Sequence, residues 1–400
     1  MSALNTRVSL LALACAFSSY SAFAADSSLT NPNISVVLDG YYQTGDRPMA
    51  EREEGFGLGE TELALSANID DMFYGKFTTT LEMHDGETEV NLEEAFIQTT
   101  GLPSGFSIRA GRFLSDIGYL NNQHPHTDSF SERPAVYRAI LGGHYFDDGI
   151  RVNYVAPTDL YWTMGLEAFK GEKMRAVDEH EEREFDNVGV YSAFTKFGGD
   201  IGIDSSWQLG LGYLRNENGK TFAEEHDPAE EEAEDEHAHE GHSHSASYTG
   251  ENTHVTDFVY KWAPNGNYKY KHLTVSGEYF RVTDIFAMEP GHIPEADHED
   301  ISTDDYHQGW YISSVYQFSP SWSAGLRYGE VDANLIHEDH LETQTLEESE
   351  LSLAWHSSHF STVRLQYTHQ KGINFDGFED DNILTLQYVM SLGAHGAHQF

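Results

Sequence analysis

One short stretch decides the fold class of this chain: residues 322–329, which read WSAGLRYG. Large apolar side chains alternate there with small or polar ones, so that Trp322 and Leu326 fall on one face of an extended strand and Arg327 on the other. The first face is suited to lipid and the second to water. The stretch therefore predicts a β-strand that divides an apolar environment from an aqueous one.

The same alternation recurs along the whole mature chain. It is present in residues 62–67, 73–83, 207–213, 351–356 and 363–368. No sustained period of about 3.6 residues, which would indicate an amphipathic helix, interrupts it. Strands therefore dominate the predicted structure, although a soluble β-sandwich would alternate in the same way.

The connections between the strands separate a membrane barrel from a sandwich. Seven short turns are predicted near residues 70–71, 101–104, 157–159, 198–200, 264–267, 319–321 and 358–360. Eight longer polar segments lie between them, at residues 44–55, 84–87, 114–147, 172–184, 217–251, 285–304, 332–346 and 371–380. Outer-membrane barrels alternate short periplasmic turns with long outer loops in this way. The pattern predicts an all-β, transmembrane antiparallel β-barrel of about 16 strands in the cell outer membrane, wide enough for an aqueous channel.

Residues 1–24 are predicted to be a signal peptide, which leaves residues 25–400 for the barrel. An apolar run at residues 8–17 follows a basic start, and small residues at 22–24 suit cleavage. The run is much shorter than the about 20 residues of a membrane-spanning helix. A lipoprotein cleavage site at Cys15 is the weaker alternative, because the apolar run ahead of it is unusually short. Without Cys15 the mature chain has no cysteine, so any metal site must use His, Asp or Glu.

Composition and charge also fit a barrel. The chain has 22 Tyr, 23 Phe and 35 Gly but only 11 Pro, as expected when alternate residues face lipid and water. Its formal net charge of −43 should repel nucleic acid and attract cations. A serine elbow, a phosphate-cradling glycine loop and a helical zinc-protease motif are all missing from the sequence. We therefore predict no nucleic-acid partner and no enzymatic activity.

A segment rich in histidine and acid stands out within the predicted outer loop 221–248. No packed core can form from it. Imidazole and carboxylate suit zinc, copper or nickel, which makes the loop a candidate for metal capture. An equally weighted alternative is a solvated loop whose charge resists aggregation. No cofactor is required, and any Zn²⁺ or other divalent cation would bind loosely because the ligands lack fixed spacing. The candidate metal ligands are His226, His237, His239, His242 and His244.

A second candidate site is the long segment 114–147, placed where porins commonly fold a loop into the barrel. Arginines concentrate here opposite local acids, in an otherwise acid-rich chain. Opposed charges would give a transverse field that sets ion selectivity. A slightly favoured alternative is that the arginines pair with the acids and hold the loop in place. The candidate constriction residues are Arg109, Arg112, Arg133, Arg138, Asp147, Asp148 and Arg151. We assign His124 and His126 to loop anchoring, because two histidines alone make an incomplete metal site.

Several segments of the chain resemble known outer-membrane proteins. The segment NLEEAF at residues 91–96, with GRF at 111–113 and Gly118, resembles the strand-turn-strand unit of phosphate-selective-type porins. That resemblance implies a sixteen-stranded barrel that is often trimeric. Residues 122–160, which contain NQHPHT, RP, YRA, GG, DDG and APTDL, and the ending SLGAHGAH at 391–398 are similar to outer-membrane proteins linked to zinc limitation. Members of that group are sometimes labelled TonB-dependent receptors, but this chain is too short for a plugged transporter of about 22 strands.

Together these observations predict a porin-type channel for small hydrophilic solutes or cations. Its outer loops would capture divalent metal; the resemblance points to zinc, whereas the residues indicate only a metal. The alternative is a surface-exposed metal-binding or interaction protein that a barrel anchors without an open channel. The expected partners are outer-membrane lipid, the barrel-assembly machinery and divalent metal ions, and the resemblance implies a homotrimer.

Overall fold

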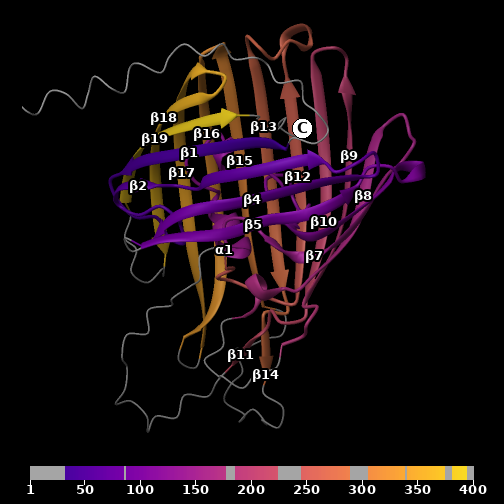
Figure 1. Ribbon diagram of the computed structural model, residues 1–400. Helices are drawn as coiled ribbons and strands as arrows, with labels where there is room; N and C mark the ends of the chain where they lie inside the picture. The colour runs from indigo at the N-terminus through magenta and orange to yellow at the C-terminus, as the bar shows by residue number, and fades with distance from the viewer. Residues whose placement is uncertain are drawn as a thin grey trace, which may run out of the picture.

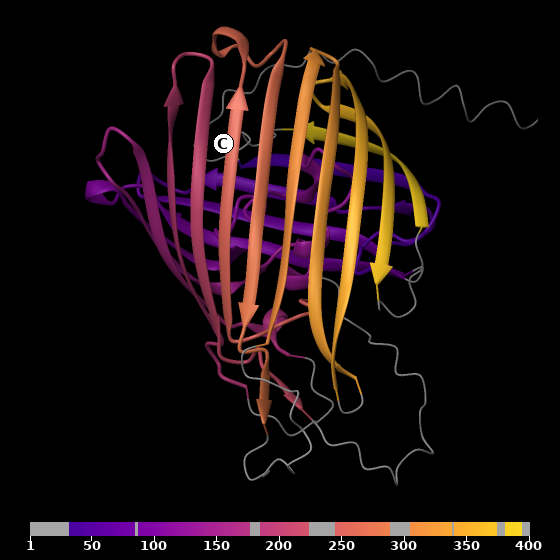
Figure 2. The ribbon, with the colours of Figure 1, turned by 180° about the vertical axis from the view of Figure 1, so that it is seen from behind.

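The chain folds into a closed antiparallel β-barrel (Figure 1, Figure 2). The computed structural model describes residues 32–84, 87–176, 185–223, 245–288, 305–337, 340–373 and 381–393. Within these ranges a single sheet holds 17 strands; β2 (Gly55–Leu58) and β3 (Thr61–Asn68) both pair with β1 (Asn33–Gln43) and share a position in the wall. The last strand, β19 (Asp381–Gly393), pairs with β1 and closes the barrel at 16 positions. The predicted all-β antiparallel barrel is confirmed.

The remaining elements follow in chain order. The wall strands are β4 (Phe73–His84), β5 (Glu87–Thr99), β6 (Phe106–Leu114), β7 (Phe146–Val155), β8 (Tyr161–Phe169), β9 (Val190–Ile201), β10 (Ser205–Asn216), β12 (Asn252–Trp262), β13 (His272–Thr283), β15 (Tyr306–Ser319), β16 (Trp322–His337), β17 (His340–Ser358) and β18 (Ser361–Ile373). Outside the wall, β11 (Thr221–Ala223) pairs with β14 (Phe286–Met288) in a second sheet. The helical elements in the described residues are α1 (Ala135–Leu141) and the 3-10 turns Pro103–Gly105, Pro125–Thr127, Glu172–Met174 and Pro264–Gly266.

The wall strands alternate between an apolar outer face and a polar inner face. On β16, Leu326 is 61% exposed on the outside, whereas its neighbour Arg327 is 5% exposed and points inward. The strands on either side repeat the pattern, with Ile312 and Leu351 outward and Glu350 inward. Such an apolar belt suits lipid. The closed barrel suits lipid as well, because it leaves no backbone edge unpaired.

Arginine at position 326 is expected to weaken the barrel in lipid. The Leu326→Arg change puts a charge on the apolar outer face of β16, at a cost of about 2 to 4 kcal/mol near the bilayer midplane. Denaturant unfolding of the protein refolded in lipid vesicles measures that loss. The control, Leu326→Met, keeps an apolar side chain and should cost less than about 1.5 kcal/mol. Equal stability of the two variants would contradict the outward placement of this side chain.

Short and long connections alternate between the two ends of the barrel, but one predicted turn is wrong. The turn expected near residues 198–200 lies later, because β9 continues to Ile201 and the chain turns at Gly202, whose φ is 68°. The glycine pair that suggested the turn stays in the ladder, opposite Trp207 and Gln208 of β10. Gly198 and Gly199 therefore allow close approach of neighbouring groups within the sheet and do not form the turn.

One predicted outer loop is also wrong. The segment 332–346 is not a loop, since β16 runs to His337 and β17 begins at His340. The alternation continues there through polar sequence, with Ala333 and Leu346 buried on the inner face. Paired strands therefore extend well beyond the length expected for one membrane crossing.

A short helix, α1, is not among the elements predicted from the sequence. Its seven residues are too few to show a helical period. All seven are buried, and the helix ends at Gly142, whose φ of 60° suits glycine. α1 lies inside the barrel, behind β4 and β5 in the view of Figure 1. No helix among the described residues is long and apolar enough to cross a membrane.

Candidate functional site

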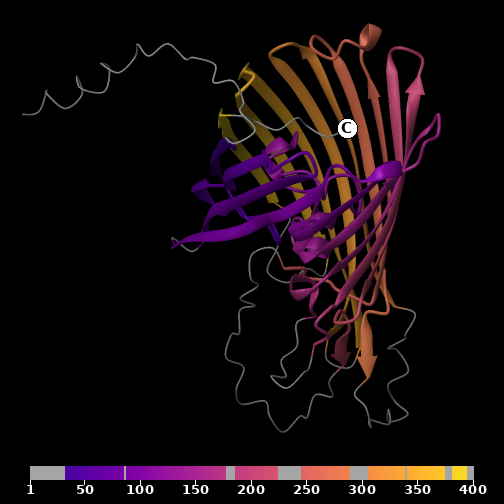
Figure 3. The ribbon, with the colours of Figure 1, turned by 45° about the vertical axis from the view of Figure 1, so that its right-hand side comes forward.

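The segment between β6 and β7, residues 115–145, folds into the barrel; we call it the inner loop. In Figure 3 it lies between the N-terminal strands, drawn in indigo and violet, and the wall of C-terminal strands. The Ser131 amide donates to the Gln366 side chain of β18 at 2.8 Å. The Ser129 carbonyl accepts from the Ser352 hydroxyl of β17 at 2.9 Å. The inner loop therefore reaches the opposite wall and crosses the lumen.

An apolar cluster fixes the inner loop within the barrel. It joins buried side chains of α1 to the inner faces of β5, β6, β13, β15, β16 and β17, and its members include Phe96, Phe113, Ile140, Phe280, Tyr311, Val331 and Leu346. The ring of Tyr137 meets that of Phe280 edge-on, with 5.2 Å between centroids. Gly309 of β15 leaves room for the helix, since a Cβ there would lie 2.7 Å from the Val136 side chain. The cluster thus connects two sides of the wall through the loop.

A single carboxylate, Glu278 of β13, anchors the inner loop both near its start and at α1. The Tyr137 hydroxyl donates to its two oxygens at 3.0 and 2.9 Å, and the Tyr311 hydroxyl donates at 2.7 Å. The backbone N–H groups of Tyr119 and Leu120 donate at 2.8 and 3.1 Å. Because all these groups are buried or nearly so, losing the common acceptor would leave several donors unsatisfied.

Buried arginines tie two further segments to the wall through Glu348 of β17. Arg47, in the segment between β1 and β2, lies 2.7 Å from Glu348 and 2.9 Å from Glu350. Arg138 of α1 lies 2.7 Å from the other oxygen of Glu348, and Arg327 of β16 pairs with Glu350. All five side chains are 5% exposed or less. Removing one charge would leave another buried and uncompensated.

Five of the seven predicted constriction residues face the interior: Arg109, Arg133, Arg138, Asp147 and Arg151. Arg133 donates to the Leu120 carbonyl at 2.9 Å, which ties it within the inner loop. Arg138 donates to the Pro48 carbonyl at 3.1 Å. Arg151 lies 2.5 Å from Glu167 of β8, which also accepts the backbone N–H of Asp116 in the inner loop at 3.0 Å. These contacts fit the alternative in which arginines hold the loop in place.

Arg109 and Asp147 have other kinds of contact. Arg109 donates to the amide oxygen of Gln98 at 2.9 and 2.7 Å, and its guanidinium lies 4.1 Å from the centre of the Phe96 ring. Asp147 is 2% exposed and accepts the backbone N–H of Gly171 at 2.6 Å. Asp147 therefore caps the next connection, while Arg109 is held by an amide and an aromatic face.

The structure places Arg112 and Asp148 outside the lumen, which corrects the predicted constriction. They lie directly opposite each other on β6 and β7 and form an ion pair of 2.8 Å. Asp148 shares the outer face of β7 with the exposed Ile150, and 53% of its side chain is exposed. The prediction failed because charge, without strand register, does not tell which face a side chain occupies.

Neighbouring charges change the pKa of acids in the inner loop. Burial alone would raise the pKa of Asp116, but Lys196 at 2.7 Å, with Arg151, lowers it to about 2. Asp116 therefore contributes stability above its unfolded pKa, and that contribution is lost as the pH falls toward 2. Burial raises the pKa of Asp128, and Arg133 at 3.3 Å offsets it only partially.

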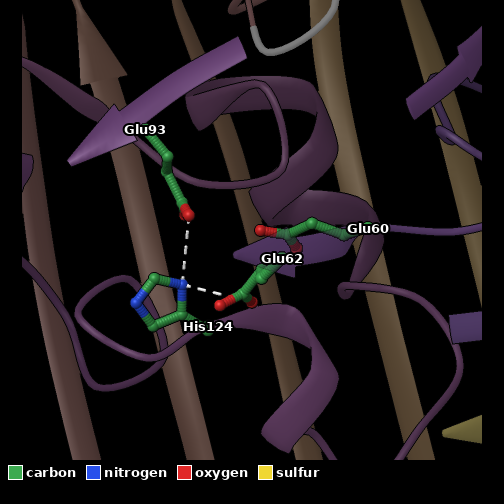
Figure 4. A group of neighbouring side chains, drawn as sticks. All are labelled: Glu60, Glu62, Glu93 and His124. Atoms are coloured by element: carbon green, nitrogen blue, oxygen red, sulfur yellow. Dashed lines mark ion pairs between the residues drawn. The ribbon is translucent and has the colours of Figure 1, made fainter. Parts of the chain in front are cut away.

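A second cluster lies where the start of β3, the middle of β5 and the inner loop meet: Glu60, Glu62, Glu93 and His124, which we call the carboxylate–histidine cluster (Figure 4). Each residue places one possible ligand atom within 4.8 Å of the others. Nδ1 of His124 lies 3.4 Å from Glu62 and 3.2 Å from Glu93. Burial alone would lower the pKa of His124, but the charges of Glu62 and Glu93 raise it well above its usual range.

Sequence reasoning missed three of these four residues. It assigned His124 to loop anchoring, and Glu60, Glu62 and Glu93 received no role. Glu62 is an acid at an inward-facing strand position, which is common in the wall of a water-filled barrel. Glu60 lies between β2 and β3, and Glu93 lies where the ladder shifts register, so the period of the strands marks neither residue. The metal ligands that were predicted, His226, His237, His239, His242 and His244, lie outside the described residues. Metal capture by that loop stays a prediction.

Comparison with known proteins adds to this picture. No protein-family model matches the chain. An uncharacterized protein of Aquifex aeolicus (strain VF5) is 27% identical over 399 residues, which cover 94% of this chain and 76% of the relative. The name of that relative gives no function. The resemblance to phosphate-selective-type porins and to the zinc-limitation group stays a prediction.

Three solved structures share the fold. An anion-selective porin from Comamonas acidovorans has a TM-score of 0.54 at 10% identity, over 90% of this chain and 99% of its own. The outer membrane channel DcaP of Acinetobacter baumannii has a TM-score of 0.54 at 12% identity, over 90% of this chain and 96% of its own. OprB of Pseudomonas putida at high pH has a TM-score of 0.54 at 12% identity, over 90% of this chain and 94% of its own. The fold is that of outer-membrane porins. This agrees with the predicted location in the cell outer membrane, because the apolar belt of the barrel requires lipid.

Proposed function

We propose that the protein is a porin-type channel for small hydrophilic solutes, narrowed by its inner loop. The observation that carries the proposal is the closed barrel of 16 positions with a polar inner face. A barrel of that size is wide enough for an aqueous path unless a segment fills it. The inner loop reduces that path, and its arginines and acids would contact solutes that pass beside it.

Single-channel conductance of the refolded protein in a planar bilayer tests the proposal. We expect discrete open steps at low salt. Complete absence of conductance in a barrel that is shown to be folded would contradict the proposal that the protein is a channel.

The channel is expected to prefer cations. The net charge of −43 makes the protein attract cations, and salt screens this effect within about 10 Å at 0.1 M. The reversal potential across a salt gradient should therefore show cation preference at low salt and a smaller preference at high salt. Uncharged sugars give the control, because their permeation should not change with salt. Equal permeation of cations and anions at low salt would contradict the prediction.

A second candidate function is a surface-exposed binding or interaction protein that the barrel anchors. The observation in its favour is the apolar cluster, which joins the wall at Phe96 to the wall at Val331 through the inner loop. A packed core that crosses a lumen excludes water from the space it fills. The conductance measurement decides between the two functions, since only a channel gives open steps.

Metal capture by the outer loop 221–248 and assembly as a homotrimer belong to the same proposal. Zinc uptake by cells that carry a chain without residues 222–246 tests the first. A fall in uptake with unchanged conductance would make the loop a capture device on a channel, and unchanged uptake would remove that role. The mass of the protein in detergent tests the trimer.

A further inference from the structure

The Glu60 carboxylate is buried without a hydrogen bond to its oxygens from the described residues. It is 2% exposed, and both oxygens are unsatisfied. In Figure 4 its carboxylate lies beside that of Glu62. Burial disfavours an isolated carboxylate, and two like charges at this spacing repel each other. A cation between them would remove both penalties.

An irregularity in the wall turns a further carboxylate toward the same point. The ladder between β4 and β5 shifts register between Thr78 and Thr79, which leaves Glu93 as the extra residue of a bulge. Adjacent residues of a regular strand face opposite sides, yet Glu93 and Glu94 are 1% and 3% exposed. Bulges commonly re-aim a side chain next to a functional site. The wall is therefore distorted where the cluster lies, and the distortion adds an inward acid.

His124 is oriented as a metal-bound histidine usually is. Its Nε2 lies 3.0 Å from a Glu94 oxygen, and Glu94 also pairs with Lys76. With a metal in place of the proton on Nδ1, the Nε2–H would donate to Glu94 and the Nδ1 lone pair would face Glu62 and Glu93. Lys76 Nζ also lies 3.0 Å from Nε2. Nδ1 makes no hydrogen bond of its own in the described structure. Metal ligands of this type commonly donate their second ring N–H to a carboxylate.

We propose that the carboxylate–histidine cluster binds one divalent transition-metal ion inside the barrel, with Glu60, Glu62, Glu93 and His124 Nδ1 as its ligands. Three carboxylates and one imidazole suit Mn²⁺ or Zn²⁺, whereas Mg²⁺ and Ca²⁺ prefer oxygen ligands alone. The positive ion offsets most of the charge of the three carboxylates. The site is distinct from the outer loop 221–248, and it does not require the barrel to conduct.

Direct binding to the refolded full-length chain tests the site. After chelator treatment, equilibrium binding of Mn²⁺ and of Zn²⁺ is measured for the wild type, Glu60→Gln and Glu93→Gln. We expect each variant to lose one tightly bound ion per chain. Mg²⁺ in excess should not displace that ion from the wild type.

Two further variants separate ligation from a general effect of charge. Glu94→Gln removes the residue that orients His124 and should weaken binding about 10- to 100-fold. Asp257→Asn is the matched control, because Asp257 of β12 is also a buried, inward-facing carboxylate with an unsatisfied oxygen, but it lies outside the cluster. Asp257→Asn should bind metal as the wild type does. A heat-dependent shift in electrophoretic mobility checks that each variant forms the barrel.

Equal numbers of bound ions in the wild type and in both glutamate variants would overturn the site and assign the metal to other residues. Anomalous diffraction from wild-type crystals grown with Mn²⁺ needs no variant. We expect a peak between the four ligands, and a peak elsewhere only, or none, would also overturn the site. A barrel that binds the ion in the cluster but does not conduct would contradict the proposed channel function and still support the metal site.

Discussion

Replacing Glu348 by alanine is expected to destabilise the barrel and release the inner loop. Glu348 accepts from Arg47 and Arg138, both at 2.7 Å, and all three side chains are buried. Removing one member of a buried ion pair costs about 3 to 5 kcal/mol, because the charge that remains has lost its partner. Arg47 keeps a second acid, Glu350, at 2.9 Å, so most of the loss falls on Arg138 and therefore on α1.

Two measurements check this result. The free energy of unfolding in denaturant should fall by about 3 to 5 kcal/mol, and single-channel conductance should rise as the loop leaves the lumen. Glu347→Ala is the matched control on the same strand: Glu347 is 31% exposed and lies 3.8 Å from Lys371. An exposed pair of that kind contributes about 0 to 1 kcal/mol. Similar losses for the two variants would show that the buried ion pairs do not anchor the loop.

The barrel could be predicted from sequence because its pattern repeats in every strand. Apolar and polar residues alternate with a period of two, which shows the face that each side chain occupies. Leu326, 61% exposed, faces outward, and Arg327, 5% exposed, faces inward. The errors lie where that signal is weak. Gly198 and Gly199 suggested a turn, although they lie in β9 and pair with β10. The polar sequence of the long β16–β17 hairpin suggested a loop.

The interior of the barrel was harder to predict, since it depends on contacts between segments far apart in the chain. The sequence places arginines in the segment 114–147, but only the fold brings Arg138 to Glu348, 210 residues away. Register explains why Arg112 lies outside, and a bulge explains why Glu93 lies inside. Neither register nor a bulge leaves a clear mark on composition or spacing.

Replacing Glu278 by alanine is the second change from which we expect a large effect. Four donors meet its carboxylate: the hydroxyls of Tyr137 and Tyr311 and the backbone N–H groups of Tyr119 and Leu120. A buried donor without an acceptor costs about 1 to 3 kcal/mol. The free energy of unfolding should therefore fall by several kcal/mol, and conductance should become larger and more variable as the inner loop loosens.

Glu278→Gln is the control, because its amide oxygen still accepts hydrogen bonds and its size is unchanged. It should retain some of the stability that Glu278→Ala loses. The double variant with Glu348→Ala then shows how the loop is held. Glu278 binds the segment around Tyr119 and also Tyr137 of α1, and Glu348 binds Arg138 of the same helix. If the two carboxylates nevertheless act as independent anchors, the losses should add within about 0.5 kcal/mol. A double loss much smaller than the sum would mean that the inner loop leaves the lumen as one unit once either anchor is removed.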